Sequence, residues 1–389
     1  PVVVLELSLG ETCEVPKLNG YDGPVAVVLG RHGAVTGRAV EGAVTLTVDM
    51  PSVAERRALW RNSVSEPSDA DSLAERFRLT SGNIRGAAAL AHSYALLDGR
   101  QRIGPRDVRI AGRAMHRELE TLATLLTTSG GWESIGASYE TIEELRNLEA
   151  RCRHREQLPD NVGASLGAQL NCGVRALFAG VSGTGKTMAA RILASTLQMD
   201  LYRLDLASVV NKYIGETEKS LNQLFSRAEE LDVVLLIDEG DALLTNRTAV
   251  QSSNDRYANL ETNFLLQRLE TFEGILIVTT NAVQRIDSAF QRRMDVVVEF
   301  HMPDPHERWT IWQLHLPAGH AVDHAWLQEA AVRCELSGGQ IRNAVLHASL
   351  LALDERHAVA TNDVARALQR EYRKSGAVCP LPQWAHAGI

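Results

Sequence analysis

Residues 180–187 read Gly-Val-Ser-Gly-Thr-Gly-Lys-Thr, with an apolar stretch (174–179) before them and an apolar-periodic stretch (188–197) after them. Glycines at this spacing allow backbone N–H groups to converge on phosphate oxygens, and the N-terminus of a following helix adds a positive partial charge. We therefore predict a strand, a phosphate-binding loop and a helix, in that order. Such a loop binds ATP or GTP.

The end of this loop carries the two side chains with the most specific roles. Lys186 is predicted to reach the β- and γ-phosphates, and the Thr187 hydroxyl is predicted to coordinate Mg²⁺. The residues expected to contact the nucleotide along this stretch are Gly180, Ser182, Gly183, Thr184, Gly185, Lys186, Thr187 and Met188.

Two acidic residues, Asp238 and Glu239, end an entirely apolar run, 233–237. Strands of this kind are buried on both faces of a parallel sheet, and ligands bind at the carboxyl ends of such strands. Asp238 is predicted to hold Mg²⁺, and Glu239 is predicted to accept a proton from the attacking water. The alternative is a solvated strand end. The glutamate favours hydrolysis over nucleotide-dependent switching.

A third apolar stretch, 275–279, leads to Asn281, and the pair Arg292 and Arg293 precedes a fourth, 296–300. An amide at a strand end can orient the lytic water or sense the γ-phosphate, although asparagines there also make turns. Adjacent arginines usually face solvent. After such a strand, they also suit a finger that enters the nucleotide site of a neighbouring subunit.

Composition excludes several classes of protein. The 389 residues are 45% hydrophobic and 23% charged, which is ordinary for a globular protein of two or three domains. A net charge of −8 gives no basic field for nucleic acid, and no apolar run approaches the length of a membrane helix. Five cysteines without a C-x-x-C pair fit reduced thiols. We expect a cytoplasmic protein without nucleic-acid or membrane partners.

Together these motifs resemble the AAA clade of the AAA+ ATPases, over about residues 131–375. The resemblance implies an α/β fold in which a P-loop AAA+ module, a parallel sheet flanked by helices, spans 126–303. It also implies a helical lid at 304–376. ATP and Mg²⁺ are the implied cofactors, and a homo-oligomeric ring, most often a hexamer, is the implied assembly.

The same resemblance suggests roles for residues outside the core motifs. Ile135 and Gly136 match the segment that packs on the adenine, and Arg342 is a candidate for sensor 2, an arginine that many members of the clade lack. Tyr213 and Ile214 match the pore loop that grips a threaded protein client. Tyr213 is alternatively a buried core aromatic.

The chain also contains an internal repeat. Residues 44–60 share Met-Pro, Glu-Arg and Trp with 296–312 at a constant offset. Further matches join 81–85 to 338–342 and 107–108 to 363–364. Self-similarity of this kind marks a duplicated supersecondary unit. The helical lid is therefore expected to have a second copy near the N-terminus.

In the earlier copy the catalytic groups are missing. Leu7 stands where the repeat places Glu239, and Gly30-Arg31 replaces Asn281. We expect a degenerate AAA module with an α/β remnant at 1–50 and its helical lid at 51–125, and a C-terminal tail at 377–389. Because the chain starts with Pro and not Met, we expect it to be part of a longer protein; a natural half-module is the alternative.

A degenerate module before an active one, with the tract at 211–219, resembles a bacterial AAA subgroup often encoded beside extracellular contractile injection systems. This resemblance implies a ring-forming ATPase that remodels, unfolds or loads protein clients. Two other classes stay open: a slow regulatory or scaffolding ATP-binding protein, and a nucleic-acid motor or clamp loader.

Overall fold

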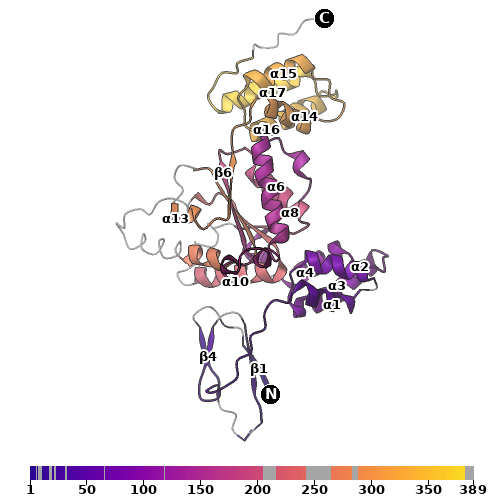
Figure 1. The fold of residues 1–389 in the computed structure, drawn as a ribbon. Coiled ribbons are helices and arrows are strands. Elements are labelled where there is room, and N and C mark those ends of the chain that lie inside the picture. The colour runs from indigo at the N-terminus through magenta and orange to yellow at the C-terminus, as the bar shows by residue number, and fades with distance from the viewer. Residues whose placement is uncertain are drawn as a thin grey trace, which may run out of the picture. The chain divides into compact units, whose positions relative to one another are not determined.

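The computed structural model (Figure 1) describes residues 1–5, 7, 11–16, 20–21, 23–30, 33–64, 66–117, 119–204, 216–241, 264–282 and 288–381. Contacts divide these residues into two compact units. The first unit comprises 1–123 together with 216–232 and 264–268. The second comprises the remaining described residues. The division therefore falls just before Thr124, close to the predicted start of the ATPase module.

A six-stranded sheet with the order β10-β6-β9-β8-β7-β5 organises the second unit. Its strands are β5 (Thr124–Leu126), β6 (Val174–Gly180), β7 (Leu201–Leu204), β8 (Val234–Ile237), β9 (Ile275–Thr280) and β10 (Val296–Phe300). All neighbours pair in parallel except β5, which runs antiparallel to β7 at the edge. The predicted α/β fold with a mainly parallel sheet is confirmed, and the antiparallel edge strand is an addition to it.

Two long helices, α6 (Tyr139–His154) and α8 (Lys186–Thr196), share one hydrophobic core with this sheet. Every residue of β8 and β9 is buried, as expected of strands covered on both faces. Helix α8 begins at Lys186, two residues before the predicted start, because Gly185 forms its N-cap with a left-handed φ of 104°. Shorter elements are η1 (Trp132–Ser134), η2 (Pro159–Asn161), α7 (Ala164–Gly167) and α13 (Ser288–Gln291).

A four-helix group follows the sheet in the second unit, and we call it the second lid. It contains α14 (Pro305–His315), α15 (His324–Arg333), α16 (Gly338–Asp354) and α17 (Thr361–Lys374), with a hydrophobic cluster of its own. Ser337 caps α16 in a capping box with Gln340. The N-cap of helix α17 is Ala360, and the Asp363 carboxylate accepts the N–H of that residue at 2.8 Å.

The first unit contains two small parallel sheets and a helical group that we call the first lid. The strands are β1 (Val2–Leu5) with β3 (Ala26–Leu29), and β2 (Thr12–Glu14) with β4 (Ala34–Thr36). The helices of the first lid are α1 (Val53–Arg61), α2 (Pro67–Arg76), α3 (Ser81–Leu97) and α4 (Pro105–Met115). The unit also holds α5 (Leu119–Leu122) and α10 (Glu216–Leu231). No helix among the described residues has the length and apolarity needed to cross a membrane.

The two lids repeat one set of buried contacts. In the second lid, the Arg308 guanidinium donates to the carbonyls of Pro303 at 2.6 Å and Ala331 at 2.7 Å. In the first, Arg56 donates to the carbonyls of Pro51 at 2.7 Å and Ala74 at 3.0 Å. The matching tryptophans, Trp60 and Trp312, are both fully buried. The internal repeat therefore corresponds to equivalent packing in the described residues.

We predict that Arg308→Met destabilises the second lid by about 2–4 kcal/mol, because it leaves buried carbonyl groups without donors. Hydrogen exchange measured peptide by peptide should show faster exchange in α14–α17 and unchanged exchange in α1–α4. Arg56→Met is the matched variant, and it should loosen α1–α4 alone. Equal loosening of both lids by either variant would contradict the equivalence of the two arginines.

Candidate functional site

A cleft of about 250 Å³ lies in the second unit, where β6, β8 and β9 end and α8 begins. The carboxyl ends of parallel strands are the usual place for a ligand in sheets of this kind. The cleft is lined by Ser134, Ile135, Gly136, Ser182, Gly183, Thr184, Gly185, Lys186, Thr187, Met188, Asp238, Glu239, Thr279, Asn281, Ile311, Leu314, His315, Gly338, Gly339 and Arg342. Apart from Gly180, every predicted nucleotide contact is among these residues, as are Glu239 and Asn281.

The loop between β6 and α8 has a shape that requires glycine. Gly183 has a left-handed φ of 83°, and a Cβ added to it would lie 2.7 Å from the Ser337 hydroxyl oxygen. Its carbonyl accepts the N–H of Gly339, at the start of α16, at 2.8 Å. The second lid therefore contacts the loop directly, and the loop conformation is fixed by backbone geometry on both sides.

Lys186 is a buried cation, and its hydrogen-bond partners in the described part of the chain are neutral oxygen atoms. It is 7% exposed, and Nζ donates to the carbonyls of Gly180 at 2.7 Å and Val181 at 2.9 Å and to Asn281 Oδ1 at 2.9 Å. Burial lowers the pKa of Lys186 from its usual value, although the negative charge of Asp238 acts in the opposite direction. A buried charge is costly unless an opposite charge compensates it, so the site suits an anion such as a phosphate group.

Hard oxygen ligands lie beside this lysine. Thr187 Oγ1 is 3.2 Å and 3.3 Å from the two carboxylate oxygens of Asp238. The Thr279 hydroxyl also reaches Asp238, donating to Oδ1 at 2.7 Å. A hydroxyl and a carboxylate next to a phosphate-binding loop match the donor set that Mg²⁺ prefers, since it is held by one or two protein oxygens together with substrate phosphates. The residues present therefore fit a magnesium–nucleotide complex.

Glu239 adopts an unusual backbone conformation. Its φ is 55°, in the left-handed region that residues other than glycine rarely occupy. Its N–H donates to Thr279 Oγ1 at 3.0 Å, and the N–H of Gly240 donates to the Thr279 carbonyl at 2.8 Å. The side chain is exposed and lines the cleft. Backbone outliers of this kind concentrate at functional sites.

Asn281 is fixed from two sides. Its Oδ1 accepts from Lys186, and its N–H donates to Asp241 Oδ1 at 3.1 Å. The Thr280 hydroxyl donates to the same Asp241 oxygen. Asp241 thus joins the loop after β8 to the end of β9.

The two predicted finger arginines do not line this cleft. Among the described residues, Arg292 is exposed and has no hydrogen-bond or ion-pair partner, whereas Arg293 Nε donates to Glu270. The turn that carries them is held by Asp295, whose carboxylate accepts from Arg175 Nε at 2.9 Å and from Arg151 at 2.7 Å. These contacts hold the turn in place while the Arg292 guanidinium stays available.

The second lid adds residues that sequence reasoning did not single out. Ile311, Leu314 and His315 line the cleft from α14, at helical spacing of three and four residues. Burial, together with the positive charge of Arg342, lowers the pKa of His315, which is therefore neutral at neutral pH. A neutral, partly apolar wall suits the flat face of a base.

Thr279, on β9, is a further residue of the cleft that the sequence analysis does not name. Its position two residues before Asn281 on a strand places both side chains on the same face, and this spacing was a usable signal.

Tyr213 and Ile214, the predicted pore residues, lie outside the described residues.

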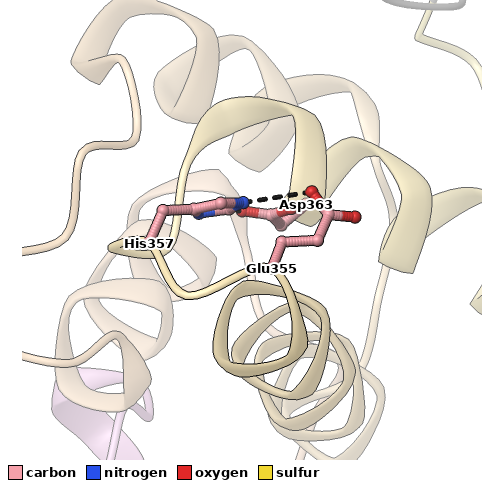
Figure 2. A group of neighbouring side chains, drawn as sticks. All are labelled: Glu355, His357 and Asp363. Carbon is pink, nitrogen blue, oxygen red and sulfur yellow. Dashed lines mark hydrogen bonds and ion pairs between the residues drawn. The ribbon is translucent and has the colours of Figure 1, made fainter.

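A second cluster of polar groups lies in the second lid, at the turn that joins the end of α16 to the start of α17 (Figure 2). Glu355, His357 and Asp363 place one oxygen or nitrogen atom each within 4.8 Å of one another. His357 Nδ1 lies 2.8 Å from the Ala358 carbonyl oxygen, and Nε2 lies 3.2 Å from Glu355 Oε2. Both ring nitrogens thus face acceptors, which favours an imidazolium without a lone pair for a metal.

The first lid supports this interpretation of the cluster. Arg100 occupies the matching position there, and its guanidinium bridges Asp98 at 3.0 Å and Asp107 at 2.6 Å. Asp107 and Asp363 are both buried and accept the N–H of the residue that caps the following helix. The cluster is therefore a cation between two carboxylates that closes a helix–helix turn.

The first lid has an arginine at this position and the second lid has a histidine, which can lose its charge. We therefore predict that the stability of the second lid depends on pH. The carbonyl of Ala358 and the carboxylate of Glu355 raise the pKa of His357 above its usual value near 6.5. Stability from a raised pKa is fully present below the unfolded-state pKa and is lost as pH rises through the folded-state pKa. The melting temperature of the second lid should fall slightly between pH 6 and pH 8.5. His357→Arg should abolish this step, and an unchanged profile would contradict the ion-pair role.

Known protein families resemble this part of the chain. Residues 176–302, which contain most of β6 and all of β7 to β10, match the ATPase family associated with various cellular activities (AAA). This agrees with the resemblance inferred from the motifs. The matched residues include most of the six-stranded sheet and much of the cleft.

Among curated proteins, a 26S proteasome regulatory subunit 4 homolog of Oryza sativa subsp. japonica is 30% identical over 240 residues, covering 59% of this chain and 52% of its own length. Proteasome-activating nucleotidase 2 of Halobacterium salinarum is 30% identical over 203 residues, covering 50% and 49% respectively. The proteasome-activating nucleotidase of Methanosphaerula palustris is 29% identical over 245 residues, covering 59% of each.

The chain thus spans about half the length of the curated relatives it matches. The family match covers the strands that place Lys186, Asp238, Glu239 and Asn281 around the cleft. Residues 176–302 are therefore an AAA ATPase domain.

Proposed function

We propose that the chain is a ring-forming ATPase that couples ATP hydrolysis to the remodelling, unfolding or loading of protein clients. The observation that carries the proposal is the meeting of Lys186, Thr187, Asp238, Glu239 and Asn281 around one cleft. The AAA match supports ATP as the substrate, and two relatives are named as nucleotidases that activate a proteasome.

Phosphate binding follows from the state of Lys186. Its ammonium group now donates to two backbone carbonyls and to Asn281, and a phosphate oxygen offers it a charged acceptor instead. The N–H groups at the start of α8 add the helix dipole at the same point. The glycine-dependent turn at Gly183 leaves the backbone open to the phosphates.

The hydrolytic step falls to the two acidic residues and the asparagine. Thr187 and Asp238 are the residues that would hold Mg²⁺, which would supply positive charge to neutralise the phosphates. Glu239 accepts the proton of the attacking water. The side-chain oxygen of Asn281 accepts a hydrogen bond from Lys186, so its NH₂ group can donate to the γ-phosphate or to that water.

A subunit interface completes the site. Because Arg292 does not line its own cleft and is exposed, we propose that it enters the cleft of a neighbouring subunit, with Arg293 beside it. A contact of this head-to-tail kind closes into a ring, and the family resemblance implies a hexamer. An apolar stripe on α16 supports such an interface, since Leu346, Leu350 and Leu353 are 57%, 61% and 74% exposed.

The remaining roles rest on the sequence patterns. We propose that Tyr213 and Ile214 grip the client in the pore and that residues 1–125 are a degenerate AAA module. Parallel pairing of β1 with β3 supports the latter, because β8 and β9 pair in the same way. The succession of a degenerate and an active module supports a client within a contractile injection system. Five cysteines that form no disulfide bond among the described residues fit a cytoplasmic location.

The proposal is tested by mixing two inactive variants. Arg292→Ala subunits keep an intact cleft but lack the finger, and Glu239→Gln subunits keep the finger but lack the base. Mixed rings should recover hydrolysis at interfaces where an intact cleft meets an intact finger. If activity never exceeds the weighted sum of the two variants at any mixing ratio, the finger does not act between subunits.

A further inference from the structure

The end of β9 supplies one residue with two contacts to the acidic pair. Thr279 is 1% exposed, and its hydroxyl donates to Asp238 Oδ1 at 2.7 Å while accepting the N–H of Glu239 at 3.0 Å. A hydroxyl has one proton and two lone pairs, so both bonds form at once. One buried atom thus contacts two consecutive residues of the site.

The contact with Glu239 supports an unfavourable backbone conformation. A φ of 55° in a residue with a Cβ persists only where neighbouring groups hold it. Thr279 holds this turn twice, through its hydroxyl to Glu239 and through its carbonyl to Gly240 at 2.8 Å. A Cβ added to Gly240 would lie 2.8 Å from Val278 Cγ1, so the turn packs tightly on β9. The side chain of Glu239 lines the cleft as a result of this turn.

The contact with Asp238 sets the rotation of its carboxylate. Thr187 Oγ1 lies 3.2 Å and 3.3 Å from the two Asp238 oxygens, so it does not select one of them. The shorter bond from Thr279 goes to Oδ1 alone and fixes the plane of the group. Hydrogen-bonded partners of metal-binding carboxylates commonly tune metal affinity and activity in this way.

We propose that Thr279 is a positioning residue for ATP hydrolysis, whose single hydroxyl sets both the orientation of the Asp238 carboxylate and the turn that presents Glu239. This inference rests on the proposed function of the cleft. Thr279 differs from the charged residues that contact the nucleotide, because it acts through Asp238 and Glu239. It predicts a coupled loss of Mg²⁺ affinity and turnover when the hydroxyl is removed.

The test compares Thr279→Val, which keeps the shape and removes the hydroxyl, with Thr279→Ser, which keeps the hydroxyl. We expect Thr279→Val to lower kcat by about 10–100-fold and, in a binding measurement without turnover, to raise the Mg²⁺ concentration needed for half-maximal binding of a fluorescent ADP analogue by about tenfold. The KM for ATP at saturating Mg²⁺ should stay within about threefold, and Thr279→Ser should recover most of kcat. A merely structural role would not split kcat from KM or be rescued by serine.

Thr196→Val is the matched control, since the Thr196 hydroxyl donates to the Leu193 carbonyl at the far end of α8. It should leave kcat and the Mg²⁺ dependence unchanged. If Thr279→Val does not fold, Thr279→Ala removes the same hydroxyl from a smaller side chain. Wild-type kcat and Mg²⁺ dependence in the folded variant would overturn the inference. Absence of ATP hydrolysis by the wild-type chain would instead overturn the proposed function.

Discussion

Glu239→Gln should bind ATP with nearly wild-type affinity and hydrolyse it about 10²–10⁴ times more slowly, as expected when a general base is removed. Glutamine has the size of glutamate and can keep the N–H contact from residue 239 to Thr279, but its amide cannot accept a proton. Nucleotide binding to the cleft depends mainly on Lys186 and the backbone of its loop, which this change does not touch.

This result is measured as kcat from phosphate release and as affinity from a fluorescent ATP analogue. Glu299→Gln, an exposed glutamate on β10 outside the cleft, is the control and should have no effect. A Glu239→Gln variant that fails to bind nucleotide would contradict the role of Glu239 in activating water. Full hydrolysis by this variant would contradict it as well.

Lys186→Ala should weaken nucleotide binding by about 100-fold or more, because it removes the buried charge that faces the phosphates. Hydrolysis should be lost at the same time. The effect differs from that of Glu239→Gln, since affinity and turnover fall together. Binding is measured directly by calorimetry with ATP or ADP in the presence of Mg²⁺.

A second lysine provides the control for this change. Lys374 is 51% exposed on the last turn of α17 and forms an ion pair with Glu371. Lys374→Ala should leave nucleotide affinity unchanged, because Lys374 lies outside the cleft. If Lys186→Ala bound ATP as tightly as Lys374→Ala, the phosphates would not lie where the loop places them.

The groups whose positions the sequence predicts well are those set by adjacent residues. The loop at 180–187 requires glycines at fixed spacing, and β8 is apolar because both of its faces are covered, so Asp238 follows it at the sheet edge. The parallel order of β6, β8 and β9 then brings Lys186, Asp238 and Asn281 together. Local sequence pattern and the rules of parallel sheets are enough to predict that these three residues lie close together.

The sequence predicts less where the contacts join distant elements. His315 reaches the cleft because the second lid packs over the loop, and no pattern within α14 shows that. The contact between Arg293 and Glu270 joins residues that no local periodicity relates, and it distinguishes Arg293 from Arg292. Strand β5 has three residues and lies at a sheet edge, so it carries too little pattern to be predicted.

The internal repeat shows both what the sequence predicts and what it does not. Matching residues such as Arg56 and Arg308 are recognisable in the sequence, but the shared role of these arginines appears only in their bonds to backbone carbonyls. The match of Arg100 with His357 cannot be seen from residue type at all. It follows from the two equivalent turns that the side chains close.

The central claim is that ATP is hydrolysed at an interface between subunits. It is tested most directly by measuring the ATPase rate per subunit against protein concentration, with the mass of the assembly followed by light scattering. We predict a rate that rises as the 42.6 kDa chain assembles into a ring of about six subunits. A constant rate from a particle that remains a single subunit would contradict the account.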